Sequence, residues 1–170
     1  MRRTLPTAAA ILVAMVLQVA IAPHIAIGGV VPNMFLLVVV TLALVEGPAA
    51  GATSGFVAGL LFDLLGTAPV GPGALVLAVA GFIAGALHAH MFAEGWRLPL
   101  SVLFITSLAT EIAYGFMLSV LSAGGPFWDA LTHVILPGTV YNAVLAFLVY
   151  PWLARFLRRD PQMTTFHRLG

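Results

Sequence analysis

Two carboxyl groups in this sequence lie within apolar stretches, and each needs a physical explanation. Glu111 lies near the middle of the stretch 98–121, where lipid would make a charge cost at least about 2.5–3.5 kcal/mol. It must therefore face other helices, be protonated or have a polar partner. Glu111 could bind a ligand, a proton or a partner's helix. Alternatively, it could make an internal hydrogen bond that fixes the pairing of the last two helices, and the pattern favours this second role. The partners that its depth allows are Ser107, Thr110, Tyr114, Tyr141 and Asn142.

Asp63 is the second such carboxyl group, and it ends a predicted helix over 48–65. The helix dipole is negative at that end and disfavours a carboxylate there. The loop GTAPVGPG, at 66–73, offers free backbone N–H groups. We therefore expect the carboxylate to accept hydrogen bonds from this loop and to hold it over the end of the helices. Recognition of an external partner by Asp63 is the alternative.

The histidines do not have the spacing of a metal site. His88 and His90 point about 200° apart on a helix, and His90 and Glu94 share a face but lack a third ligand. The sequence also contains no cysteine, GxSxG elbow, HExxH motif, P-loop or pair of spaced carboxylates on one face. We therefore expect no catalytic residue, no metal and no cofactor.

The composition identifies the solvent around these side chains. The chain has 170 residues, of which 61% are hydrophobic and 8% charged, with seven Arg and no Lys. A soluble domain has roughly 45–50% apolar and roughly 25% charged residues, so this chain could not cover its surface in water. The solvent must be lipid. Disordered, coiled-coil, nucleic-acid-binding and disulfide-stabilised classes are excluded by the same counts.

The apolar stretches predict an all-α integral membrane protein with six transmembrane helices. One transmembrane domain, 1–154, precedes a basic tail, 155–170. The stretch 32–45 is short, at about 21 Å of helix, yet 32–65 is too long for one crossing, so a turn at Gly47-Pro48 must separate two helices. The expected helices are 7–22, 32–45, 48–65, 73–92, 98–121 and 133–153.

The arginines predict the orientation. Six crossings place both termini on one side of the membrane, and every arginine then falls on that side, which the positive-inside rule makes the cytoplasm. The tail cations are expected to lie along the inner leaflet of the membrane, with docking of a cytoplasmic partner as the alternative. A cleavable secretion signal is a second interpretation of the first stretch, but an uncleaved helix explains the same residues. The tail cations are Arg155, Arg158 and Arg159.

Small residues predict which helices pack most closely. In lipid, helices associate through surfaces that let their backbones approach. Glycines recur every fourth residue in the third predicted helix, and a second pair lies in the fourth. We therefore expect these two helices to pack tightly inside the bundle. The glycines are Gly47, Gly51, Gly55 and Gly59, with Gly81 and Gly85.

The block from Val31 to Gly85 resembles the MreD family of rod shape-determining membrane proteins. The order and spacing of several short elements together carry this resemblance. They are Pro32-Asn33, the run FLLVVVTLAL, Glu46-Gly47, Gly51, Gly55-Phe56, Gly59-Leu60, Asp63, Gly71 and Gly81.

The resemblance implies a non-enzymatic scaffold subunit of the bacterial cell-wall elongation complex. Such a protein binds the single-pass protein MreC through membrane helices. It helps couple actin-like MreB to RodA and its partner penicillin-binding transpeptidase, which links cell shape to peptidoglycan synthesis. We expect these proteins and membrane lipids as partners, and neither nucleic acid nor a small-molecule substrate.

The resemblance also implies a fold similar to the six-helix substrate-binding subunits of energy-coupling-factor vitamin transporters, which supplies an alternative function. Such subunits dock through small residues of their first helix, where Ala10 and Ala14 have AxxxA spacing. They also need a polar cavity. The outer loops carry few polar side chains, so the scaffold is favoured. The residues available to line a cavity are Glu111, Tyr114, His133, Tyr141 and Asn142.

Overall fold

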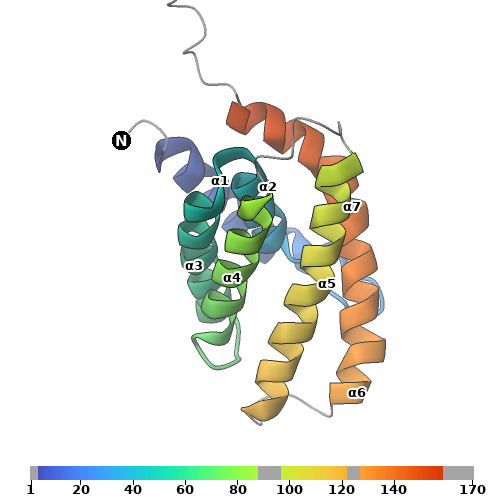
Figure 1. Cartoon of the computed structure of the whole chain (residues 1–170). Coiled ribbons are helices and arrows are strands. Elements are labelled where there is room, and N and C mark those ends of the chain that lie inside the picture. Colours follow the sequence, from blue (N-terminus) through green and yellow to red (C-terminus); the bar gives the residue numbers. More distant parts are fainter. Residues whose placement is uncertain (1–3, 88–96, 122–126, 159–170) are drawn as a thin grey trace, which may run out of the picture.

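A computed structural model describes residues 4–87, 97–121 and 127–158. Over these ranges the chain is almost entirely helical, and the helices pack side by side as a bundle (Figure 1). The elements are α1 (Thr4–Ala20), the short 3-10 helix η1 (Ala22–Ile25), α2 (Met34–Glu46), α3 (Pro48–Leu65), α4 (Pro72–Ala86), α5 (Arg97–Val120), α6 (Phe127–Ala130), the π-helical turn η3 (Leu131–Ile135) and α7 (Leu136–Arg158).

The six predicted helices correspond to α1 to α5 and to a last helix in which α6, η3 and α7 follow without a break. Three helices, Pro48–Leu65, Pro99–Val120 and Phe127–Phe156, are long and apolar enough to cross a membrane, and three apolar helices are shorter. The last helix begins earlier than predicted because no glycine or proline interrupts residues 127–136. It also continues to Arg158, so the first residues of the predicted tail are helical.

Helix α2 lies at the centre of the bundle and is enclosed by protein. Every residue from Met34 to Leu44 is buried, and α1, α3, α4, α5 and α7 all contact the helix. A helix that is apolar on all sides is typical of such a position. Because its sides meet protein instead of lipid, its length of 13 residues need not match the thickness of a bilayer.

Helices α3 and α4 form the most extensive pair in the bundle. A Cβ atom built on Gly51 would collide with the carbonyl oxygen of Gly81, and one built on Gly81 would collide with that of Gly51. Gly55 faces the backbone of Leu77 in the same way, and Gly59 faces that of Gly73. Glycine at these positions therefore lets the two backbones touch, as small residues do between membrane helices.

Gly47 has a different position from the other glycines of the series. It lies between α2 and α3 with φ +96°, and a Cβ atom there would meet no atom within 4 Å. The turn requires this positive φ, and glycine occupies the position because residues with a side chain disfavour that backbone conformation. Gly85 of α4 packs on the backbone of Gly47 and Pro48. Because glycines recur every fourth residue from Gly47, the sequence grouped it with the packing glycines. In the structure its main role is to form the turn between α2 and α3.

Pro151 lies inside α7 and explains a bend in that helix. Proline has no N–H for the carbonyl of Phe147, and its ring deflects the chain. Beyond the bend, the red end of α7 crosses the end of the bundle near the N-terminus (Figure 1). Trp152, 78% exposed, and the exposed Arg155 lie on this segment, which suits a membrane surface. Arg158 is in the last turn of α7, and Arg159 lies outside the described residues.

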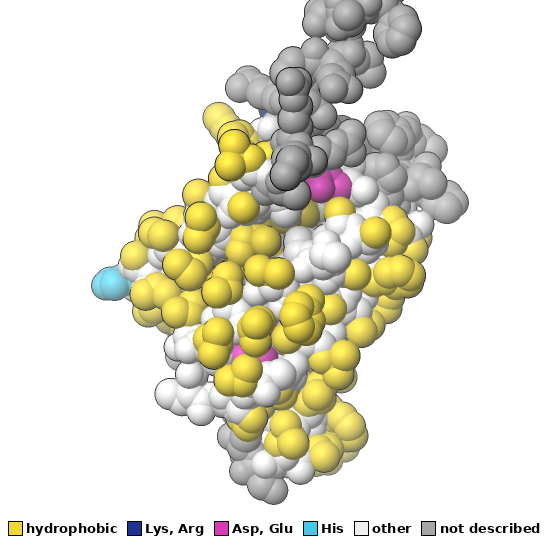
Figure 2. Space-filling model, turned by 90° about the vertical axis from the view of Figure 1, so that its left-hand side faces the viewer, with side chains coloured by type: hydrophobic (Ala, Val, Ile, Leu, Met, Phe, Trp, Pro, Cys, Tyr) yellow, Lys and Arg dark blue, Asp and Glu magenta, His cyan; other side chains and the backbone are white. Residues whose placement is uncertain are grey.

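The outer surface of the helices is apolar. Figure 2 shows hydrophobic side chains over most of one face, with little acidic or histidine surface between them. Large side chains such as Phe56, Phe82, Ile105 and Phe147 are each exposed by 51% or more. So much apolar surface needs lipid or a partner's helix as its neighbour. Together with the apolar helices, it makes this a membrane protein.

Candidate functional site

The N-terminus of α2 is buried within the bundle, and polar side chains bind its backbone. The first turn of a helix has N–H groups without intrahelical partners, and burial makes them costly to leave unpaired. Asn33 caps the helix, since its Oδ1 accepts a hydrogen bond from the N–H of Leu36 at 2.9 Å. Gln18 of α1 accepts one from the N–H of Met34 at 2.8 Å and donates one to the carbonyl of Pro32 at 3.1 Å.

Asn142 of α7 connects this helix end to α5. Its Oδ1 accepts a hydrogen bond from the N–H of Asn33 at 2.8 Å. Its Nδ2 lies 3.2 Å from Oε1 of Glu111 and 3.3 Å from the hydroxyl of Ser107. Of the five possible partners of Glu111 that the sequence offered, Asn142 is the one whose hydrogen bond to it the structure shows. The network joins α2, α5 and α7 in the middle of the bundle.

Replacing Asn142 with leucine is expected to lower the free energy of unfolding by about 2 kcal/mol. The change leaves the partly buried N–H of Asn33 without its acceptor and the partly buried Glu111 without its donor. Each loss then costs about 1 kcal/mol, the lower end of the range for unpaired buried groups. Unfolding in detergent, followed by circular dichroism, measures the loss. Val144→Leu, at an exposed position of the same helix, is the control and should be near neutral. Equal stability of the two variants would contradict a structural role for the network.

Asp63 joins the end of α3 to the start of α4. Its Oδ2 accepts hydrogen bonds from the N–H groups of Gly71 at 2.8 Å and Ala74 at 3.2 Å, and its Oδ1 accepts one from Gly73 at 3.0 Å. The carboxylate is 1% exposed. Gly71 and Gly73 lie in the loop range 66–73 from which these bonds were expected, and the structure places Gly73 and Ala74 in the first turn of α4, which begins at Pro72. The positive end of the α4 dipole therefore offsets the negative end of α3. A Cβ atom at Gly73 would collide with the carboxylate, which explains glycine there.

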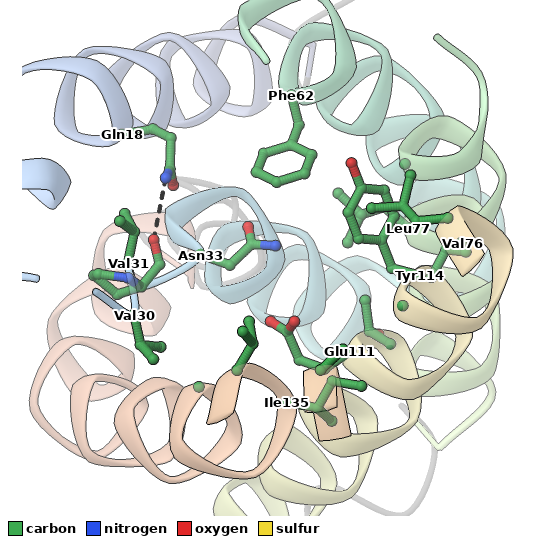
Figure 3. Close-up of a pocket in the computed structure, with 18 of the residues that line it drawn as sticks. Gln18, Val30, Val31, Asn33, Phe62, Val76, Leu77, Glu111, Tyr114 and Ile135 are labelled. Carbon is green, nitrogen blue, oxygen red and sulfur yellow. Dashed lines mark hydrogen bonds between the residues drawn. The ribbon is translucent and has the colours of Figure 1, made fainter. Parts of the chain in front are cut away.

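A cavity of about 410 Å³ lies beside the polar network, between the ends of α3, α4 and α5, the loop before α2 and the start of α7. Figure 3 shows the carboxyl group of Glu111 and the amide of Asn33 pointing into the same space, with Phe62 and Tyr114 across from them. The two aromatic rings meet edge to face at 5.7 Å between centroids. Most of the remaining wall is aliphatic.

Of the five polar residues that the sequence offered to line a cavity, the structure places two in the wall of this one and three elsewhere. Glu111 and Tyr114 line it. Tyr141 instead donates a hydrogen bond to the carbonyl of Ile25, and Asn142 is used in the network. His133 is exposed, and its Nδ1 lies near Thr132 and the carbonyl of Asp129.

Sequence reasoning missed the role of Gln18 as a ligand of the α2 backbone. A single amide in the apolar run of α1 was the available signal. The described residues hold no group of three or more His, Asp or Glu that could bind a metal. His88, His90 and Glu94 lie outside the described ranges.

An apolar groove of about 380 Å³ lies on the outside of the bundle between α1, α2 and α7. One wall consists of small side chains of α1, namely Ala9, Ala10 and Ala14, with Val13 beside them. The aromatic rings of Trp152 and Phe156 lie on the opposite wall. Small side chains let another helix approach closely in lipid.

A family model described as rod shape-determining protein MreD matches residues 1–160 of the chain. The match covers all the described helices. No significant match was found to a curated protein or to a solved structure.

Proposed function

Because the chain belongs to the MreD family of rod shape-determining proteins, we propose that it is a scaffold subunit of the bacterial cell-wall elongation complex. In this proposal it is non-enzymatic and binds the membrane helix of an MreC-like single-pass protein. Contacts with RodA, its penicillin-binding transpeptidase and MreB then couple the cytoskeleton to peptidoglycan synthesis. The family membership supports the role in rod shape determination.

The proposed membrane arrangement follows from the arginines. Six helices in the inner membrane, with both termini in the cytoplasm, leave no arginine on the outer side. Exposed Arg155, beyond the bend at Pro151, then lies at the inner leaflet and contacts anionic lipid.

The groove between α1, α2 and α7 is the observation that carries the binding proposal. It opens on the outer surface of the bundle, and its walls are almost wholly apolar. On the α1 side its accessible edge is formed by the exposed Ala9 and Val13, with the buried Ala10 and Ala14 beneath them. Two helices in lipid gain stability from close packing, because lipid already surrounds their apolar side chains. A single transmembrane helix is therefore the occupant that we propose.

The alternative, a vitamin-binding subunit with a fold similar to those of energy-coupling-factor transporters, has less support. Its docking surface would need exposed small residues on the first helix. Ala10 and Ala14 are instead 5% and 0% exposed, because they pack inward against the bundle. The cavity beside Glu111 is also mainly apolar, which suits a polar vitamin poorly.

Val13→Trp is expected to reduce recovery of the MreC-like partner at least about tenfold, which corresponds to about 1.4 kcal/mol. Val13 is 58% exposed, so the larger side chain fills the groove without entering the core. Quantitative pull-down from solubilised membranes measures the effect. Val79→Trp is the matched control, because Val79 is 49% exposed on α4, away from the groove. Equal recovery with both variants would remove the groove from the proposal. Recovery of a membrane ATPase module in place of the partner would favour the alternative.

A further inference from the structure

The cavity beside the polar network contains polar groups that the fold leaves unused. Glu111 uses Oε1 to bind Asn142, and Oε2 has no hydrogen-bond partner among the described residues. Thr110 also lines the cavity and is 4% exposed, and its buried hydroxyl has no partner in the described part of the chain. A threonine in a helix commonly satisfies its hydroxyl on a carbonyl of the preceding turn, as Thr41 does here at 2.7 Å. The hydroxyl of Thr110 is thus an unpaired buried polar group next to the cavity, and such a group calls for a partner.

The charges around the cavity favour a cationic group. Glu111 is the one acidic side chain that lines it, and no arginine lines it in the part of the chain that the structure describes. Tyr114, Asn33 and Gln18 supply neutral polar groups. A carboxyl group that is partly enclosed and lacks a cation is best paired by a positively charged hydrogen-bond donor.

The rest of the wall requires an apolar body. Valine, leucine and isoleucine side chains from α4, η3 and the loop before α2 surround the polar corner, and Phe62 covers one side. The volume of about 410 Å³ falls within the range of about 300–1,000 Å³ that is typical of small-molecule sites. A compact hydrocarbon with one polar end would place that end at the polar corner and its apolar part against the aliphatic wall.

We propose that the cavity is a binding site for a small amphipathic amine, whose ammonium group contacts Glu111 and the hydroxyl of Thr110 while its apolar part packs against the aliphatic wall. The site is distinct from the groove that we assign to the partner's helix, because the two share no lining residue. It adds a small-molecule ligand to a chain whose sequence led us to expect none. The proposal does not depend on the scaffold function, and either can fail alone.

The test uses three probes that share one hydrocarbon cage: 1-adamantylamine, 1-adamantanol and 1-adamantanecarboxylic acid. Isothermal titration of the purified full chain in detergent measures their binding. We expect the amine to bind with one-to-one stoichiometry and at least tenfold more tightly than the other two probes. Equal affinity for all three would show partitioning by the cage alone and would overturn the proposal, as would failure of the amine to bind.

Two conservative variants locate the site. Glu111→Gln keeps an acceptor for Asn142 but removes the charge, and we expect it to weaken amine binding at least tenfold. Thr110→Val keeps the shape, removes the hydroxyl, and should weaken amine binding severalfold without lowering the unfolding temperature of the unliganded protein. Glu46→Gln is the control, because Glu46 lies outside this cavity. Unchanged binding by both cavity variants, or an equal loss with Glu46→Gln, would overturn the assignment.

Discussion

Gly55→Ala is expected to lower the free energy of unfolding by about 2–3 kcal/mol, although it adds one methyl group. The new Cβ atom would lie 2.7 Å from the carbonyl carbon of Leu77 and 2.9 Å from Cα of Ala78. These are backbone atoms, so the obstruction cannot be relieved by a side-chain rotation, and α3 and α4 must separate. In an exposed helix the same change is favourable by about 1 kcal/mol. A loss of stability in Gly55→Ala, instead of this gain, would therefore indicate close contact between the backbones of α3 and α4.

Gly66→Ala is the matched control for this prediction. A Cβ atom at Gly66 would have its nearest neighbour at 3.6 Å, an ordinary van der Waals contact, and its φ of −86° suits any residue. Its stability should stay within about 0.5 kcal/mol of the parent chain. Denaturation in detergent, followed by circular dichroism, compares the two variants. If both lose the same stability, close backbone contact is not what holds α3 against α4.

Asp63→Asn is expected to cost about 3 kcal/mol or more. The carboxylate accepts three backbone hydrogen bonds, and hydrogen bonds to a charged group contribute about 1.5–3 kcal/mol each. Asparagine has nearly the same shape but one acceptor oxygen. Its NH₂ group would face the N–H of Gly73 or those of Gly71 and Ala74, so at least one buried donor loses its partner.

The loss at Asp63 is measured by the yield of folded protein and by its unfolding temperature in detergent. Asp129→Asn is the control, since Asp129 is exposed in the first turn of α6. Its removal should leave both readouts nearly unchanged. Normal stability of the Asp63 variant would contradict the structural role and would return Asp63 to the alternative, recognition of an external partner.

The positions of the two acidic groups show how far sequence reasoning reached. Their need for partners followed from depth in an apolar stretch and from the sign of the helix dipole, which are properties of residue type and position. The identity of the donors followed only in part. The loop 66–73 contains Gly71 and Gly73, two of the three donors of Asp63, but not Ala74, which lies within reach because the glycine contacts hold α4 against α3.

The central helix α2 shows a second limit. Its apolar run and the turn at Gly47 indicated a short helix, but the sequence treated it as a crossing like the others. Apolar composition cannot distinguish a helix surrounded by lipid from one surrounded by protein, because both neighbours are equally apolar. The amides of Gln18 and Asn142, which bind the buried start of α2, could be given roles only once the helices were arranged.

The sequence by itself determined the class of this protein, the number of its helices and the small residues on which two of them pack. These follow from hydropathy, from glycine and proline positions and from residue size, all of which act locally along the chain. Only the tertiary structure decided which helix is enclosed, which donors meet Asp63 and Glu111, and that a cavity remains beside them. Those outcomes depend on contacts between residues distant in sequence, such as Asn33 and Asn142, whose pairing no local pattern encodes.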